Sequence, residues 1–202
     1  TAPASPLPPP PAAATAASPA PQAPPPPDLS DFLGSWAQTE KAENIDAFLK
    51  ARGAPWPARQ MASGARLKTE ISMSGPPDEE MITIKMLTPI GEKKISFMLG
   101  TEFDLPKPGP PGSKPKLLVG IAAFEPAGLD GIEAAAGGKL VIIGYERDTR
   151  EKVMVLERTV VDEGTTLVMV EHFCTPEDPN GEADGNWNKR VLKLTGGRPP
   201  RS

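Results

Sequence analysis

The run KISFMLGTEFD at residues 94–104 is the most informative stretch for the fold, because it is the last of five short motifs whose order along the chain indicates the order of the elements. Working back from it, MITIK stands at 81–85, RQMA at 59–62, NIDAFLK at 44–50 and FLGSW at 32–36. Apolar and polar residues alternate in the first two of these motifs, as they do in a half-buried strand. The NIDAFLK motif carries the longer apolar spacing of a short helix. The series predicts a strand, a pair of helices and then a run of strands.

The two helices are short. The first is predicted over residues 44–53, because Ile45, Phe48 and Leu49 recur at i, i+3 and i+4 and make one apolar face. The second is predicted from near Pro57 to about Gly64, since proline is tolerated in the first turn of a helix.

After Gly64 the apolar period changes from helical to two, and turn signals rich in Gly, Pro, Asn and Asp separate the apolar runs. Many short strands at near-regular spacing indicate an antiparallel sandwich or barrel. The helix pair near the N-terminus narrows this choice to a barrel with a helical lid. Besides a first strand opened by Trp36, the predicted strands are 67–74, 81–87, 93–99, 117–124, 139–145, 152–158, 165–173 and 186–194.

Composition divides the chain into three parts. Residues 1–27 contain 12 Pro, 9 Ala and no charged side chain. Such a stretch cannot bury enough apolar surface to offset its ordering entropy, so we expect a disordered tail or linker. Residues 28–196 are expected to form one barrel domain, and 197–202 a flexible C-terminal tail. Long loops are predicted at 106–115, 125–138 and 175–185.

Charge and cysteine content exclude several classes of function. The net charge is −4 and the isoelectric point is near 5.2, with no basic patch, so nucleic acid is not an expected partner. No apolar run approaches the roughly 20 residues that span a bilayer. One cysteine, Cys174, cannot form an internal disulfide and fits a reducing compartment.

An arginine in the last predicted strand faces an apolar side. By parity Arg190 shares its face with Leu192 and Leu194, whereas Lys189 and Lys193 mark the other face as solvent-exposed. A guanidinium that faces the interior is costly unless it is paired, and no carboxylate lies on its own face. A ligand carboxylate would suit its planar fork.

Arg158 shows a similar but less clear pattern. It shares a face with Met154 and Leu156, although the opposite face of that strand is apolar too. Alternatively, both arginines lie outside the barrel or pair with an acidic side chain. The acidic candidates are Glu102, Glu157 and Glu171.

The order of motifs closely resembles the intracellular lipid-binding proteins, the family of fatty-acid-binding and cellular retinoid-binding proteins, over roughly residues 28–196. The resemblance implies an all-β, antiparallel up-and-down barrel of about ten strands with a two-helix lid, similar to the lipocalins and other calycins. It implies non-covalent binding and intracellular transport of a long-chain fatty acid or similar lipid carboxylate. We therefore expect a cytoplasmic monomer that is not an enzyme and has no cofactor or metal. The lid would be the surface for any transient membrane contact.

The resemblance also assigns site residues. Family members hold the ligand carboxylate with two strand arginines, which match Arg158, four residues before Asp162, and Arg190. The second arginine belongs to an Arg-x-Tyr motif, and Leu192 replaces that tyrosine here. The lost hydrogen bond would weaken carboxylate binding by roughly 1 kcal/mol. The residues implied for the cavity and its portal are Trp56, Met61, Phe97 and Leu192.

Other functions remain open from the sequence. A tethered protein-interaction module would keep the barrel without binding lipid, and its Pro tracts could dock in aromatic-lined grooves. A filled or collapsed cavity would favour that function. An extracellular lipocalin-like carrier and a haem barrel using His172 are further alternatives. His172 and Cys174 could form a nucleophilic pair, but the sequence provides no partner to orient the histidine.

Overall fold

The computed structural model describes most of the chain after the Pro-rich stretch. The predictions for 1–27, for most of the loops at 106–115 and 125–138, and for the C-terminal tail apart from Arg198 lie outside the described residues. The described residues are 28–76, 79–88, 91–107, 116–125, 138–196 and 198.

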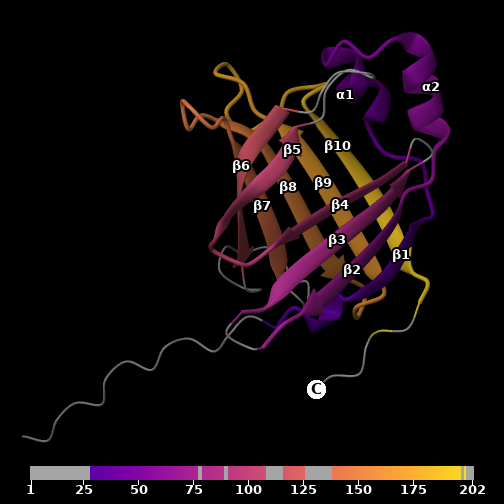
Figure 1. Ribbon diagram of the computed structural model, residues 1–202. Helices are drawn as coiled ribbons and strands as arrows, with labels where there is room; N and C mark the ends of the chain where they lie inside the picture. The colour runs from indigo at the N-terminus through magenta and orange to yellow at the C-terminus, as the bar shows by residue number, and fades with distance from the viewer. Residues whose placement is uncertain are drawn as a thin grey trace, which may run out of the picture.

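The described residues form ten strands, two α-helices and one short 3-10 helix (Figure 1). Both predicted helices are present, and each predicted strand is found with its ends shifted by a few residues. In chain order the elements are η1 (Ser30–Phe32), β1 (Gly34–Gln38), α1 (Ile45–Ala51), α2 (Trp56–Gly64), β2 (Lys68–Ser74), β3 (Met81–Thr88), β4 (Gly91–Phe97), β5 (Glu102–Lys107), β6 (Lys116–Glu125), β7 (Lys139–Tyr145), β8 (Lys152–Val161), β9 (Thr166–Phe173) and β10 (Trp187–Leu194).

The strands form one antiparallel sheet in the order β4-β3-β2-β1-β10-β9-β8-β7-β6-β5. Strands that follow one another in the chain are neighbours in the sheet, except β4 and β5. In addition, β1 pairs with β10, which brings the two ends of the domain together. The sheet curls into a nearly closed barrel whose open seam lies between its edge strands, β4 and β5 (Figure 1). The predicted up-and-down antiparallel barrel of about ten strands is confirmed.

The strand β5 was not among the predicted strands. Its sequence, EFDLPK, holds two acidic residues and a proline, all of which are depleted in strands. Proline cannot donate a ladder hydrogen bond and is therefore tolerated at a sheet edge, where β5 lies. Every second side chain still faces the interior, and Leu105 is buried.

Large aromatic side chains fill the barrel at the end away from the helices. Trp36 is buried there, and its indole Nε1 donates a hydrogen bond to the Phe32 carbonyl oxygen at 2.9 Å. The rings of Phe97 and Phe103 stack across the seam, with centroids 4.9 Å apart. A Cβ atom at Gly120 would lie 2.6 Å from the Phe103 ring, so glycine is needed for this stack.

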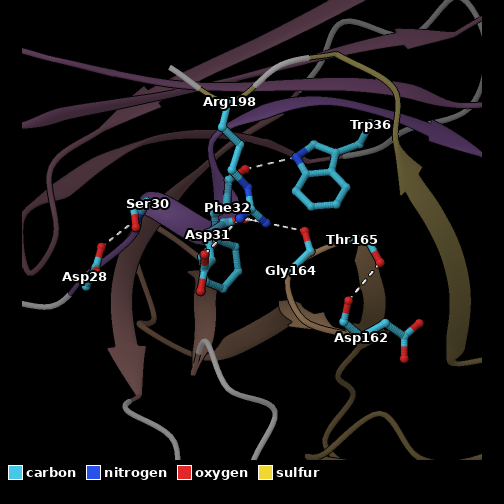
Figure 2. A network of polar contacts seen from close by, with 9 residues as sticks. All are labelled: Asp28, Ser30, Asp31, Phe32, Trp36, Asp162, Gly164, Thr165 and Arg198. Atoms are coloured by element: carbon cyan, nitrogen blue, oxygen red, sulfur yellow. Dashed lines mark hydrogen bonds and ion pairs between the residues drawn. The ribbon is translucent and has the colours of Figure 1, made fainter. Parts of the chain in front are cut away.

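A charged side chain from the end of the chain crosses this floor. The Arg198 guanidinium donates from Nη1 to Asp31 Oδ1 at 3.1 Å and from Nη2 to the Asp31 carbonyl oxygen at 3.2 Å. It also donates to the carbonyl oxygen of Gly164, in the turn between β8 and β9 (Figure 2). Arg198 therefore joins the chain beyond β10 to η1 and to a hairpin turn.

The helices lie over the other end of the barrel (Figure 1). The first helix, α1, buries Ile45 and Phe48. Arg52, which follows it, lies over the Phe48 ring at 3.2 Å and the Phe173 ring of β9 at 4.5 Å. In contrast, α2 buries none of its residues. Only α1 is thus packed firmly against the barrel wall.

Candidate functional site

A cavity of about 430 Å³ lies inside the barrel at the lid end. Its volume falls in the range of roughly 300–1,000 Å³ that is usual for small-molecule sites. Apolar side chains line it from β3, β4, β5, β8 and β9, and charged or polar side chains from β4, β5, β8, β9 and β10. Residues of its wall include Met86, Met154, Leu156, Met169, Asn188 and Leu105.

Arg158 on β8 lines this cavity and is almost completely buried, with 1% of its surface exposed. Its Nε and Nη1 atoms have no hydrogen-bond partner among the described residues. Burial lowers the pKa of the guanidinium to about 10, and the nearby carboxylate of Glu171 only partly opposes this effect. Buried polar groups are normally hydrogen-bonded, so two orphan donors on a cavity wall need an explanation.

Arg190 on β10 also lines the cavity and is half-buried. Its Nη1 donates to Gln38 Oε1 at 3.1 Å, and the same oxygen accepts from the Leu67 backbone N–H at 3.3 Å. Burial lowers the pKa of Arg190 as well, again partly opposed by Glu171. The buried side chain of Gln38 thus holds one arm of the guanidinium and leaves the rest available to the cavity.

The strand register places the two arginines in one row. Arg158 pairs with Met169 on β9, and Met169 pairs with Arg190 on β10. Directly paired residues point to the same face of a sheet, so both guanidinium groups project into the barrel. Neighbouring strands lie about 4.8 Å apart, which separates the two backbones by roughly 10 Å. This spacing lets both side chains reach a small anion between them.

Neither arginine is part of an ion pair among the residues that the structure describes. The three acidic side chains considered as partners bind elsewhere or stand apart. Glu157 lies 3.3 Å from Lys139 Nζ, and Glu102 lies 2.8 Å from Arg150. Glu171 accepts a hydrogen bond from Asn188 Nδ2 at 3.2 Å. Both arginines therefore keep capacity for an additional anion.

Lysine side chains surround the cavity mouth at the seam. Lys93 on β4 pairs with Met86 and shares the interior face, and Lys107 ends β5 on the other side of the opening. Lys107 Nζ lies 3.0 Å from Glu146 Oε1. Among the charged residues that line the cavity, strand parity places Lys93, Lys107, Arg158, Arg190 and Glu171 on the interior face. The wall is electropositive, although the chain carries a net charge of −4.

The other predicted site residues do not line this cavity. Trp56 and Met61 lie on α2 with 64% and 59% of their surfaces exposed. Leu192 is fully buried beside Leu167 in the core, two residues from Arg190. The strand β4 begins at the lid, after the β3–β4 turn, and runs away from the helices. Phe97 is its last residue, so it is buried at the end of β4 farthest from the lid. The prediction that places Phe97 beside the lid is not what the structure shows.

Five polar residues of the site were not singled out as site residues from the sequence: Gln38, Lys93, Lys107, Glu171 and Asn188. Glu171 has the same parity as Met169 and Phe173, so its strand pattern could have revealed it. Gln38 and Lys107 gave no local signal, because their roles depend on the pairing of β1 with β10 and on the place of the seam.

The residues suggested for chemistry occupy other places. A ring nitrogen of His172, Nδ1, lies 3.1 Å from the Gly181 carbonyl oxygen. Cys174 is buried, and burial raises the pKa of its thiol, which disfavours the reactive thiolate. The described residues contain no cluster of three or more His, Cys, Asp or Glu that could hold a metal ion. In the same part of the chain, no helix combines the length and apolarity needed to cross a membrane.

Comparison with known proteins identifies relatives in sequence. Models of protein families give no match. Human fatty acid-binding protein 9 is 37% identical over 73 residues, which are 36% of this chain and 52% of that protein. The fatty acid-binding protein of Schistosoma japonicum is 36% identical over 78 residues, 38% of this chain and 54% of that protein. The chain thus spans about half the length of the curated relatives it matches.

Solved structures match over most of the barrel. A fatty acid-binding protein of Schistosoma mansoni in complex with arachidonic acid aligns with a TM-score of 0.57 and 20% identity, covering 83% of this chain and 98% of that one. The REP1-NXSQ fatty acid transporter aligns with a TM-score of 0.56 and 21% identity, covering 82% and 97%. At this identity the structural likeness speaks for the fold. The chain is thus similar in sequence to fatty acid-binding proteins over about half their length, and it shares its barrel fold with solved fatty acid-binding proteins.

Proposed function

We propose that this protein binds and transports a long-chain fatty acid or similar lipid carboxylate inside the barrel. The observation that carries the proposal is the buried guanidinium of Arg158, which lines a cavity and keeps two N–H donors without partners among the described residues. A ligand carboxylate between Arg158 and Arg190 would accept hydrogen bonds from these donors and attract both guanidinium groups. Charge-assisted bonds of this kind are roughly twice as strong as neutral ones.

The hydrocarbon chain would provide most of the affinity. Each buried CH₂ group is worth about 0.8 kcal/mol, and the cavity wall offers Met86, Leu156 and Met169 as apolar contacts. The carboxylate would fix orientation and discriminate against uncharged lipids. The lysines at the seam would attract an anionic ligand toward the opening.

The relatives support the same function. Several are named fatty acid-binding proteins, and one structural neighbour was solved with arachidonic acid. By analogy, this chain would act as a carrier rather than an enzyme and would work as a monomer in the cytoplasm. Trp56 and Met61 on the weakly packed helix α2 would then belong to the surface through which ligands enter or a membrane is touched.

A tethered interaction module without lipid binding is the second candidate. It would be favoured by a filled or collapsed barrel. The open cavity of about 430 Å³, with two donors of Arg158 on its wall that no described residue satisfies, supports the carrier instead.

The test is displacement of the fluorescent probe 12-(9-anthroyloxy)stearate by oleate from delipidated protein. We expect saturable displacement by wild type and at least about tenfold weaker binding in Arg190→Ala, because a hydrogen bond to a charged group is worth about 1.5–3 kcal/mol. Arg150→Ala is the matched control, since Arg150 lies on the surface with Glu102 as its partner.

Two results would contradict the proposal. Oleate that binds wild type and Arg190→Ala equally would show that the arginines do not hold the carboxylate. Protein that binds neither probe nor oleate would favour the interaction module.

A further inference from the structure

The cavity wall contains a carboxylate that a simple fatty-acid site does not need. Glu171 on β9 pairs with Leu156 on one side and Asn188 on the other, and all three line the cavity. Its row is adjacent to the row that contains Arg158 and Arg190. If the ligand carboxylate lay between the arginines and the alkyl chain extended toward the lid, the first carbons of that chain would lie beside the Glu171 carboxylate.

The charges at this place set the charge of the ligand. Glu171 lies within electrostatic reach of both arginines, because it opposes the lowering of each arginine's pKa. Glu171 acts on Arg52 in the same way, so three guanidinium groups stand near one carboxylate and this end of the cavity is net positive. A ligand carboxylate between Arg158 and Arg190 is attracted by this charge, whereas a second anionic group beside Glu171 would be repelled by it. The site is therefore suited to a ligand with one anionic group at the arginines and none beside Glu171.

The hydrogen bonds of Glu171 set a second requirement. An ionised carboxylate accepts about four hydrogen bonds. Among the described residues, the side-chain donor to this carboxylate is Asn188 Nδ2, at 3.2 Å from Glu171 Oε2. A ligand that displaces water from this half-buried carboxylate without donating to it would leave an acceptor unsatisfied, which opposes binding. A ligand that carries a donor at this point would keep the carboxylate satisfied.

The register shows where that donor must be. Glu171 is two residues along β9 from Met169, which lies between the arginines. Two residues of strand span roughly 6.7 Å, and the glutamate side chain shortens this distance further. The donor must therefore stand within a few carbons of the ligand carboxylate.

We propose that the ligand is a fatty acid with a hydroxyl group close to its carboxylate, and that Glu171 is the residue that selects it. The carboxylate accepts from Arg158 and Arg190, and the hydroxyl donates to Glu171. Asn188 is a positioning residue, because its amide holds Glu171 at the cavity wall. This inference rests on the proposed lipid-binding function and specifies its substrate class.

The experiment compares palmitate, 3-hydroxypalmitate and 1-hexadecanol by isothermal titration calorimetry on delipidated wild type, Glu171→Gln and Glu70→Gln. Glu70 is the control, an exposed carboxylate on β2 whose partner is Lys85 at 3.7 Å. In wild type and Glu70→Gln we expect 3-hydroxypalmitate to bind about tenfold more tightly than palmitate. In Glu171→Gln we expect this preference to disappear and palmitate to bind more tightly than in wild type, because a repulsive charge is gone.

Each unfavourable outcome has a distinct meaning. Equal binding of both acids by wild type overturns the inference and leaves the proposed function intact. A hydroxyl preference that survives in Glu171→Gln also overturns it. Tighter binding of hexadecanol than of 3-hydroxypalmitate overturns the inference, because it rejects an anionic headgroup between the arginines. Binding of none of the three overturns the proposed function and the inference together. The wild-type comparison decides the question even if Glu171→Gln fails to fold.

Discussion

Arg158 affects both the proposed function and the stability of the barrel. It carries a buried charge whose Nε and Nη1 donors have no partner in the part of the chain that the structure describes, an arrangement that favours a bound anion and opposes folding of the empty protein. Binding sites often contain such locally unfavourable arrangements, since the ligand provides what the fold leaves out.

Replacing this charge should strengthen the empty barrel. For Arg158→Met we expect the free energy of unfolding of delipidated protein to rise by about 1–3 kcal/mol, because apolar replacements of buried charges are often stabilising. Oleate affinity should fall at the same time. Urea denaturation measures the first effect and probe displacement the second. Arg147→Met, on the surface, is the control; a loss of stability in Arg158→Met would show that Arg158 is a structural residue.

The same residue makes ligand binding sensitive to alkaline pH. Burial lowers the pKa of Arg158 to about 10, so the folded protein loses this charge well before an ordinary arginine would. The destabilisation is present below pH 10 and fades as the pH rises through that value. Oleate affinity should be flat from pH 7 to 9 and fall by up to about tenfold at pH 11. The same titration on Arg158→Met should show no such fall, and a parallel fall in both proteins would assign the effect to another group.

At the scale of single residues, the sequence predicted the orientation of Arg190 better than the positions of other site residues. The inward face of Arg190 followed from parity, since Lys189 and Lys193 mark the outer face. Arg158 could not be assigned by parity alone, because Val153 and Val155 make its outer face apolar. Phe97 was misplaced because a motif match gives a position in the chain and not its distance from the lid.

At the scale of elements, the two helices of the lid differ in how they are held. Asn44, before α1, donates from Nδ2 to the Trp187 carbonyl oxygen at 3.0 Å, and Arg52, after it, stacks on Phe173. By contrast, α2 buries no residue, and an ion pair of 2.9 Å between Arg59 and Asp46 joins it to α1.

This difference predicts uneven opening of the lid. We expect backbone amides of α2 to exchange with solvent faster than those of α1, because few buried contacts oppose local unfolding of α2. Hydrogen–deuterium exchange with peptide resolution would measure both segments in one experiment. Equal protection of the two helices would mean that the lid moves as a single unit.

Most elements were predictable because their signals are local. Alternating apolar residues marked nine of the ten strands, and the spacing of Ile45, Phe48 and Leu49 marked α1. The exception, β5, has a weak local pattern and is stabilised by its pairing with β6. Tertiary pairing of this kind is not visible in a single segment.

At the scale of the whole molecule, Arg198 ties the end of the chain to the barrel floor (Figure 2). For Arg198→Ala we expect a loss of about 1–2 kcal/mol in the free energy of unfolding, since its hydrogen bonds to Asp31 and Gly164 are partly buried. Thermal denaturation followed by circular dichroism would measure it. Arg66→Ala, at an exposed position, is the control. No change in Arg198→Ala would show that these contacts add nothing to stability.

The open seam between β4 and β5 has a consequence for the protein at high concentration. A sheet edge exposes unpaired backbone N–H and C=O groups, which can pair with another molecule and start aggregation. Here β4 presents the exposed charges of Glu92, Lys93 and Lys94, and β5 includes Pro106, which has no N–H to offer. The charged residues of β4 and the proline of β5 thus line the open seam and also oppose the pairing of edge strands between molecules.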